Sequence, residues 1–499
     1  MHASQVEYGD VQGLVRWGYG YLAEACFLLL RVVDPVAARS WLASAPISTA
    51  EATEPRPEVA LQVAFTYQGL RALELSADVA DQLAPEFVAG LSSEESRARR
   101  LGDVGANAPQ QWEWGAPGQT PHALLMLYAK PGKLEEWSRS VAARVSDAGF
   151  EILQRLHTSD LGGFEHFGFR DGISQPTIDW EQRKSLRGLQ LEYSNLLALG
   201  EVLLGYPNEY GKYTNRPLLD PPSDPTDQLL PAPDDPRKKD FGRNGTYLVL
   251  RQLTQDVRGF WHFLDQQTGS DPTRRQRLAE SMVGRTIDGE PLAQAARSAI
   301  AGISPADAGL NQFTFESDQL GVRCPFGAHI RRANPRNGDM PYGTTGVLGK
   351  LLRTLGFGQT SFRDDTVAST RFHRLLRRGR AYGPPVKPAE ALAQPDAQGD
   401  QRGLHFICLN ANISRQFEFV QNAWIMGAKF DALTEERDPI LGNRAPMTGC
   451  PRSETFSLPQ DGRVRSRIGN VPQFVTVRGG AYFFLPSLRA LRYIASRRG

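Results

Sequence analysis

A chain of 499 residues, 40 % of them hydrophobic, is long enough to build two or three domains or one large duplicated domain. Its 57 lysines and arginines nearly balance its 55 aspartates and glutamates, and the net charge of +2 argues against nucleic acid or an anionic membrane as the main partner. The sequence also lacks a run of about 20 apolar residues that could span a bilayer. We therefore expect a globular protein that acts on a small molecule.

The cysteine pattern favours a reducing compartment. The four cysteines are Cys26, Cys324, Cys408 and Cys450. They form no CxxC pair and are too sparse for a secreted domain held together by disulfides. The short apolar stretch from Cys26 to Leu30 has no basic leader, so it predicts a core strand rather than an export signal. We expect a cytoplasmic protein.

The first predicted element is a buried strand that runs into an amphipathic helix, in the segment FLLLRVVDPVAARSWL at 27–42. The segment YLVLRQLTQDVRGFWHFL at 247–264 repeats it at one constant offset, which pairs Trp41 with Trp261. A second repeat relates the strand HALLMLYAK and the helix around Trp137 to LHFICLNAN and QFEFVQNAW later in the chain. Two unrelated strand–helix units are the alternative explanation.

These repeats predict two β-α-β-α halves of the α+β class. Helices that cover one face of a mostly antiparallel sheet are the usual solution for such halves, and the ferredoxin-like arrangement is the commonest one. Between the halves, the prolines and aspartates of 216–242 resist both helix and strand and predict a linker or surface loop. We place the N-terminal half at 1–215 and the C-terminal half at 243–499.

Two further stretches have the character of insertions on this scaffold. One is the charged helical run at 271–301, and the other is the glycine-rich segment at 337–370. Insertions of this kind often line a pocket.

The segment GGFEHFGFRDGISQP surrounds Asp171 with glycines and aromatic residues and ends in a proline. A turn of that composition can hold a carboxylate in a fixed position. An Asp-Gly hairpin turn, or an aspartate that caps the next helix, explains the same residues without a functional role.

Of the eight histidines, only His329 has local support for a ligand role. It lies in CPFGAHIRRANPR, where Gly327 and Ala328 leave room for a flat ligand and the nearby arginines can pair with carboxylates. A haem has that shape and those carboxylates. A nucleotide or anion site, or a plain basic loop, is the alternative.

The combination of GFRDG with the later HIRRANPR resembles the dye-decolourising peroxidases, whose signature is a GxxDG motif followed by a proximal histidine in the second ferredoxin-like half. The resemblance covers nearly the whole chain, including the opening GDVQGLVRWGYGYLAEACFLLLR, then RLLRRGRAYG, GLHFICLNANISRQFEFVQNAW and RDPILGN. The long stretch between the histidine and RLLRRGRAYG is similar to the larger subgroup with several insertions. The resemblance implies a tandem duplicated ferredoxin-like β-sandwich with peripheral helices and a haem bound mainly by the second half.

Carried onto this sequence, the resemblance implies that His329 is the proximal iron ligand, Asp171 the distal acid–base group and Arg377 the distal cation. The long insertion weakens the placement of the arginine, so Arg374 and Arg378 are the other candidates.

The resemblance assigns four more residues around the haem. Leu404 and Phe406 match the apolar pair that forms the wall of the distal pocket, and Asp438 in RDPILG matches a carboxylate that accepts a hydrogen bond from the proximal imidazole. Arg336 is the implied partner of a haem propionate.

The implied function is a haem peroxidase that uses hydrogen peroxide to form an oxoferryl intermediate and oxidises dyes, phenols or similar organic reductants. One haem b per chain is the implied cofactor. A haem carrier, sensor or iron-release protein on the same scaffold is the alternative, although it would not need both Asp171 and Arg377. We expect no nucleic acid or membrane partner, and a homo-oligomer stays open.

Overall fold

The structure is a computed structural model that describes residues 6–182, 195–294, 308–336, 370–394, 401–431, 433–446 and 452–496. The glycine-rich insertion expected at 337–370 lies outside the described residues except for its last residue, and so does the end of the charged run at 271–301. Within the described ranges, no helix is long and apolar enough to cross a membrane.

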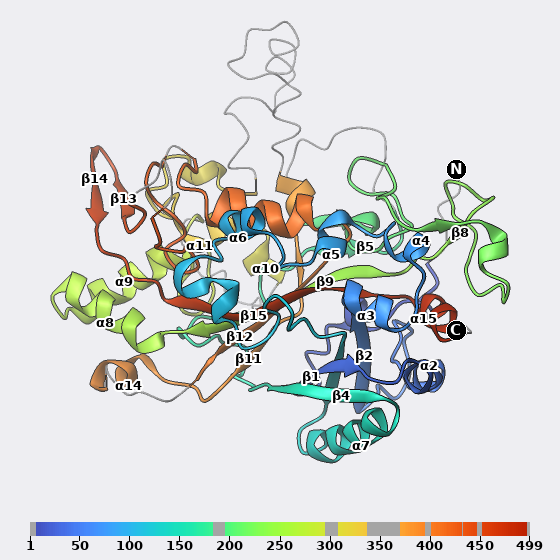
Figure 1. Cartoon of the computed structure of the whole chain (residues 1–499). Helices are drawn as coiled ribbons and strands as arrows, with labels where there is room; N and C mark the ends of the chain where they lie inside the picture. The colour runs from blue at the N-terminus through green and yellow to red at the C-terminus, as the bar shows by residue number, and fades with distance from the viewer. Residues whose placement is uncertain are drawn as a thin grey trace, which may run out of the picture.

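The N-terminal half is an antiparallel sheet with helices on its outer face. Its strands are β1 (Glu24–Val32), β2 (Val59–Phe65), β3 (Ala123–Ala129) and β4 (Phe150–His157). They lie in the order β2-β3-β1-β4, which is the ferredoxin-like order. Its helices are α1 (Leu14–Trp17), α2 (Pro35–Ser44), α3 (Tyr67–Ala72), α4 (Ala77–Ala80), α5 (Pro85–Ala89), α6 (Glu95–Leu101), η1 (Gly105–Asn107), η2 (Pro109–Gln111) and α7 (Leu134–Asp147). Helix α7 packs on β4, β3 and β1 (Figure 1).

The C-terminal half repeats this order. Its strands are β9 (Thr246–Gln255), β10 (Leu376–Arg377), β11 (Arg380–Tyr382), β12 (Gly403–Asn410) and β15 (Val475–Leu485). Strands β10 and β11 both pair with β12 and together take the place of the second strand of this half. The order across the sheet is therefore second, third, first and fourth strand, as in the N-terminal half. Its helices are α8 (Val257–Thr268), α9 (Pro272–Val283), α10 (Ala308–Asn311), η5 (Glu316–Asp318), α11 (His329–Ala333), η6 (Thr370–His373), α14 (Pro388–Ala393), the π-helical η7 (Ser414–Glu418) and η8 (Val420–Ile425), and α15 (Leu488–Ala495).

The two halves join into one sheet of nine strands among the described residues. Strand β15 pairs with β2 at Phe484 and Phe65, which connects the last strand of one half to the second strand of the other. At the opposite edges, the Ser159 N–H after β4 donates to the Ala381 carbonyl of β11 at 2.8 Å. The sheet therefore curls until its outer edges meet, and the inner faces of the two halves pack against each other.

Both faces of β1, β2, β3 and β9 are buried, which explains their continuous apolar runs. On β1, Phe27 and Leu29 belong to the cluster between the two halves, whereas Leu28 and Leu30 belong to the cluster beneath the helices, and all four are 0 % exposed. The predicted α+β class, with two ferredoxin-like halves and the repeated strand–helix units at matching positions, is confirmed.

The remaining elements connect or extend the halves. They are β5 (Thr177–Asp179), β6 (Leu196–Ala198), η3 (Leu199–Glu201), β7 (Leu218–Leu219), η4 (Pro221–Ser223), β8 (Lys239–Asp240) and the hairpin β13 (Phe456–Gln460) and β14 (Arg463–Ile468). In the proline-rich segment between the halves, buried Arg216 donates from Nε to Asp240 Oδ2 at 2.6 Å, so the beginning and the end of this segment are held together.

Candidate active site

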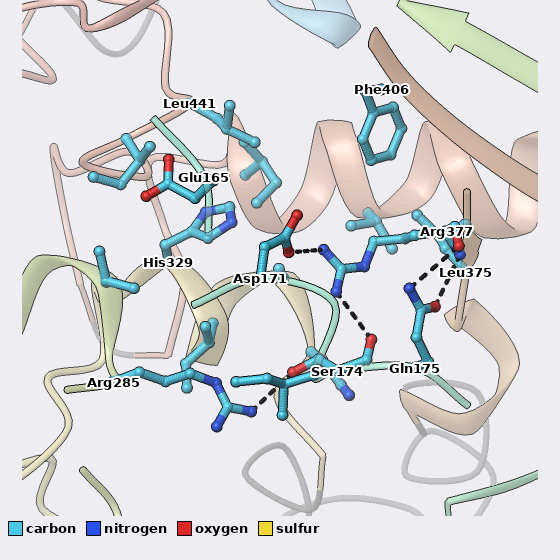
Figure 2. Close-up of a pocket in the computed structure, with 18 of the residues that line it drawn as sticks. Glu165, Asp171, Ser174, Gln175, Arg285, His329, Leu375, Arg377, Phe406 and Leu441 are labelled. Atoms are coloured by element: carbon cyan, nitrogen blue, oxygen red, sulfur yellow. Dashed lines mark hydrogen bonds and ion pairs between the residues drawn. The ribbon is translucent and has the colours of Figure 1, made fainter. Parts of the chain in front are cut away.

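A cavity of about 270 Å³ lies between the helices of the C-terminal half and the turn that follows β4 (Figure 2). Its lining includes every site residue predicted from the sequence except Asp438, which lies behind the wall. Most of the lining comes from the C-terminal half, and the N-terminal half contributes mainly the turn at 165–176.

His329 is the first residue of α11, and its imidazole is oriented by Asp438. The Nδ1 atom lies 2.9 Å from Asp438 Oδ2, and Asp438 itself is 0 % exposed. The other carboxylate oxygen, Oδ1, accepts the backbone N–H groups of Ile440 and Leu441 at 2.8 Å each. Nε2 of His329 has no hydrogen-bond partner among the described residues, and the ring lines the cavity. One ring nitrogen is thus fixed and the other is available to a ligand.

Electrostatics support this pairing. Burial alone would lower the pKa of His329, but the Asp438 carboxylate outweighs burial and raises the pKa. Burial would raise the pKa of Asp438, and here His329 and the Leu441 N–H outweigh burial and lower the pKa. Asp438 is therefore held as an anion beneath the ring.

Asp171 projects into the same cavity from a tight turn. Its backbone N–H donates to the Gly163 carbonyl at 2.9 Å, and a short antiparallel bridge joins Phe164 to Arg170 just before it. Gly172 has a φ of +80°, which explains the glycine after the aspartate. The element that follows is β5, so Asp171 does not cap a helix; the turn directs its side chain into the cavity.

Arg377 is the guanidinium that meets Asp171. Its Nη1 lies 3.5 Å from Asp171 Oδ1, and its Nη2 donates to the Ser174 carbonyl at 3.2 Å (Figure 2). Arg378 points the other way, because it donates to the carbonyls of Leu14 and Val15. Both members of the Asp171–Arg377 pair stay accessible from the cavity, with side chains 42 % and 33 % exposed.

The other predicted residues line the cavity around this pair. Leu404 and Phe406 on β12 form apolar wall, and Arg374 lines the cavity as well. Arg336 ends the HIRRANPR segment with a φ of +59°, and it donates to the carbonyls of Asn311 and Phe313 at 2.8 and 3.0 Å.

The lining fits a haem. His329 offers a ring nitrogen that has no hydrogen-bond partner in the described part of the chain, Leu404, Phe406 and Leu441 offer apolar surface, and cations exceed anions in the described lining. The arginines of the described lining are Arg170, Arg285, Arg336, Arg374 and Arg377, and its carboxylates are Glu165 and Asp171. A flat, apolar ligand with carboxylates at one edge matches that distribution.

Comparison with known proteins decides the family. No protein-family model matches the chain. The multifunctional dye peroxidase of an Amycolatopsis species is 31 % identical over 451 residues, which cover 87 % of this chain and 81 % of the relative. The chain belongs to the dye-decolourising peroxidases. It is therefore a haem-dependent peroxidase, as the sequence motifs indicated.

Solved structures of dye-decolourising peroxidases share the fold. A fungal peroxidase of this type from Auricularia auricula-judae superposes with a TM-score of 0.72 at 23 % identity, covering 99 % of this chain and 100 % of that one. A dye-decolourising peroxidase in complex with 2,6-dimethoxyphenol superposes with a TM-score of 0.71 at 23 % identity, covering 98 % and 100 %.

Glu165 and Arg285 are among the charged residues of the peroxidase pocket that were missed in the sequence. Glu165 accepts the N–H groups of Phe167 and Phe169 and the side-chain amide of Gln255 at 2.9 to 3.0 Å, and burial raises its pKa to about 7. Glu165 lies in the same sequence segment as Asp171, and its position there could have indicated a role in the pocket. Arg285 follows α9 inside a predicted insertion, where nothing in the sequence distinguishes it from other arginines.

Proposed function

We propose that His329 binds the iron of one haem b per chain through Nε2. The observation that carries this proposal is the 2.9 Å contact between His329 Nδ1 and Asp438, which leaves Nε2 to the cavity that also contains the Asp171–Arg377 pair. A carboxylate that accepts the imidazole N–H makes the ring a stronger donor to iron. Asp438 is the positioning residue in this proposal.

When bound, the haem supplies the iron centre that passes electrons from the organic reductant to peroxide. Asp171 is the proposed proton carrier: its carboxylate takes a proton from one oxygen of hydrogen peroxide and returns it to the other oxygen, which leaves as water. Arg377, whose Nη1 lies 3.5 Å from Asp171 Oδ1, is proposed to stabilise negative charge as the oxygen–oxygen bond breaks. A haem carrier or sensor has no need of such a pair.

Leu404 and Phe406 are proposed to keep the distal side small and apolar, so that peroxide enters and bulky reductants stay outside. Arg336 is proposed to pair with a haem propionate. Dyes, phenols and similar compounds are the proposed reductants, and the related structure that contains 2,6-dimethoxyphenol supports a phenolic reductant.

The remaining assignments are also proposals. We assign residues 1–215 and 243–499 to the two halves and 216–242 to the connection, and we infer a cytoplasmic protein without nucleic acid or membrane partners. The described cysteines, Cys26, Cys324 and Cys408, are buried free thiols, which suits a reducing compartment. A homo-oligomer is compatible with the proposal.

The test of His329 as the residue that would hold the iron is the absorption spectrum of the purified His329→Ala variant. We expect the Soret band of the wild-type haem to disappear or shift, because the iron loses its protein ligand. His262→Ala is the matched control, since His262 is a partly buried histidine that contacts the Leu392 carbonyl outside the cavity. An unchanged Soret band at full haem occupancy in His329→Ala would show that His329 does not bind the iron.

A further inference from the structure

Arg285 is a buried cation with spare hydrogen-bond donors in the cavity. It is 4 % exposed, and its Nη1 donates to the carbonyls of Gly289 and Leu310 at 2.6 and 3.0 Å. Its Nη2 donates to Ser174 Oγ at 2.9 Å. These bonds use three of the five N–H groups of a guanidinium. The Nε–H and one N–H of Nη2 have no acceptor among the described residues.

Nε and Nη2 share the edge of a guanidinium that binds a carboxylate through two parallel hydrogen bonds. All three acceptors of Arg285 are neutral, and in the described part of the chain no carboxylate lies within ion-pair distance of it. A buried cation without a counter-ion is costly, so the charge of Arg285 calls for an anionic partner.

The neighbours of Arg285 add positive charge. The guanidiniums of Arg285 and Arg336 both lie over the ring of Phe313, at 5.4 and 3.8 Å from its centroid. Burial, followed by the charges of Arg336 and Arg377, lowers the pKa of Arg285 to about 9. Asp171 offsets Arg377. The cationic end of the cavity therefore suits a ligand that brings negative charge of its own.

The polar and apolar parts of the cavity lining also match a ligand with one charged edge. Arg285 and Ser174 lie at one end of the cavity, and Leu441 and Phe406 lie at the other (Figure 2). A tetrapyrrole with its propionates toward Arg285 would meet apolar lining away from those propionates.

We propose that Arg285 binds a carboxylate of the haem through its Nε and Nη2 edge, and that it makes the pocket selective for a tetrapyrrole with ionised carboxylates. This inference rests on the proposed haem site. Arg285 is not part of the family motifs. In this proposal it contributes to the higher affinity of the pocket for a macrocycle with ionised carboxylates than for a neutral one.

The test titrates haem-free full-length protein with haemin and with haemin dimethyl ester, and it follows the Soret band to obtain each Kd. We expect wild-type protein to bind haemin about 10- to 100-fold more tightly than the ester, the factor that one or two charge-assisted hydrogen bonds provide. In Arg285→Met, haemin should lose the part of this advantage that Arg285 provides, while Arg336 keeps its own part, and the affinity for the ester should change little. Arg285→Lys, which keeps the charge without the two-donor edge, should fall between them.

Arg258→Met is the matched control, because Arg258 is a buried arginine that donates to the carbonyls of Glu390 and Gln394 outside the cavity. It should leave the preference for haemin intact. Equal weakening of both ligands in Arg285→Met, or no weakening of haemin, overturns the proposal. Equal affinity of wild-type protein for haemin and ester overturns it without any variant. If wild-type protein binds neither ligand, the proposed haem site itself fails.

Discussion

At the scale of single residues, the turn at 165–176 that carries Asp171 depends on a second, buried carboxylate, that of Glu165. Glu165 accepts hydrogen bonds from two N–H groups of its own turn and from Gln255 on β9. The turn is thereby joined to the central sheet of the C-terminal half. We interpret Glu165 as a positioning residue that holds Asp171 in place.

Glu165→Ala should destabilise the protein and slow its reaction with peroxide while haem stays bound. Three N–H groups lose their acceptor, and unsatisfied donors cost about 1–3 kcal/mol each, partly relieved by water that reaches the cavity. We expect the free energy of unfolding to fall by about 2–3 kcal/mol in denaturant titrations, and Glu165→Gln to recover about half of the loss. Glu290→Ala, at an exposed glutamate, is the control. Wild-type stability and peroxide rate in Glu165→Ala would show that the turn does not need this carboxylate.

At the scale of elements, a π-helical segment forms one wall of the pocket. Glu418 N–H donates to the Ile413 carbonyl, five residues back, and the cavity-lining residues Phe417, Gln421 and Ile425 recur at intervals of four. A wider helical turn of this kind is rare and is often found at functional sites. Its first turn is anchored by Glu201, whose carboxylate pairs with Arg415 at 2.6 Å.

The Glu201 anchor should make stability depend on pH. Glu201 is 0 % exposed, and burial, only partly opposed by Arg415, raises its pKa from 4.5 to about 7. The folded state therefore binds a proton that the unfolded state releases between those values, so stability falls as pH rises from about 4.5 to 7.

Urea unfolding of wild-type protein and Glu201→Gln, at pH values from 5 to 8, measures this effect. The stability of the wild type relative to the variant should decrease by about 2–3 kcal/mol over the range, because the Glu201 carboxyl is the one titrating group that differs between the two proteins. Parallel curves, or a relative gain with rising pH, would mean that the carboxylate is already ionised at pH 5 in the folded protein.

At the scale of the whole molecule, two ferredoxin-like halves join into one curled sheet, and the cavity lies where the turn after β4 reaches the C-terminal half. The repeated strand–helix segments were sufficient to predict this duplication, because strands buried on both faces are continuous apolar runs in the sequence. The edge contacts that close the sheet could not be predicted, since backbone hydrogen bonds such as that between Ser159 and Ala381 carry no side-chain signal.

The residues of the site also divide into those that could be located from the sequence and those that could not. Asp171, His329 and Arg377 could be located because each lies in a motif, and the structure brings Asp171 and Arg377 together as the motif order suggested. Arg285 could not, because its role depends on which acceptors surround it in space. The helix around QFEFVQNAW was predicted, but its π-helical form depends on the register of backbone hydrogen bonds, which apolar spacing alone does not specify.

The rate at which the haem-loaded Asp171→Asn variant reacts with hydrogen peroxide, followed by stopped-flow absorbance, tests the central claim most directly. Asparagine keeps the shape of the side chain and cannot accept the proton. The account predicts a haem spectrum like that of the wild type before mixing and a peroxide rate lowered by about 10²- to 10⁴-fold. A variant that reacts with peroxide at the wild-type rate would contradict the assignment of Asp171 as the proton carrier.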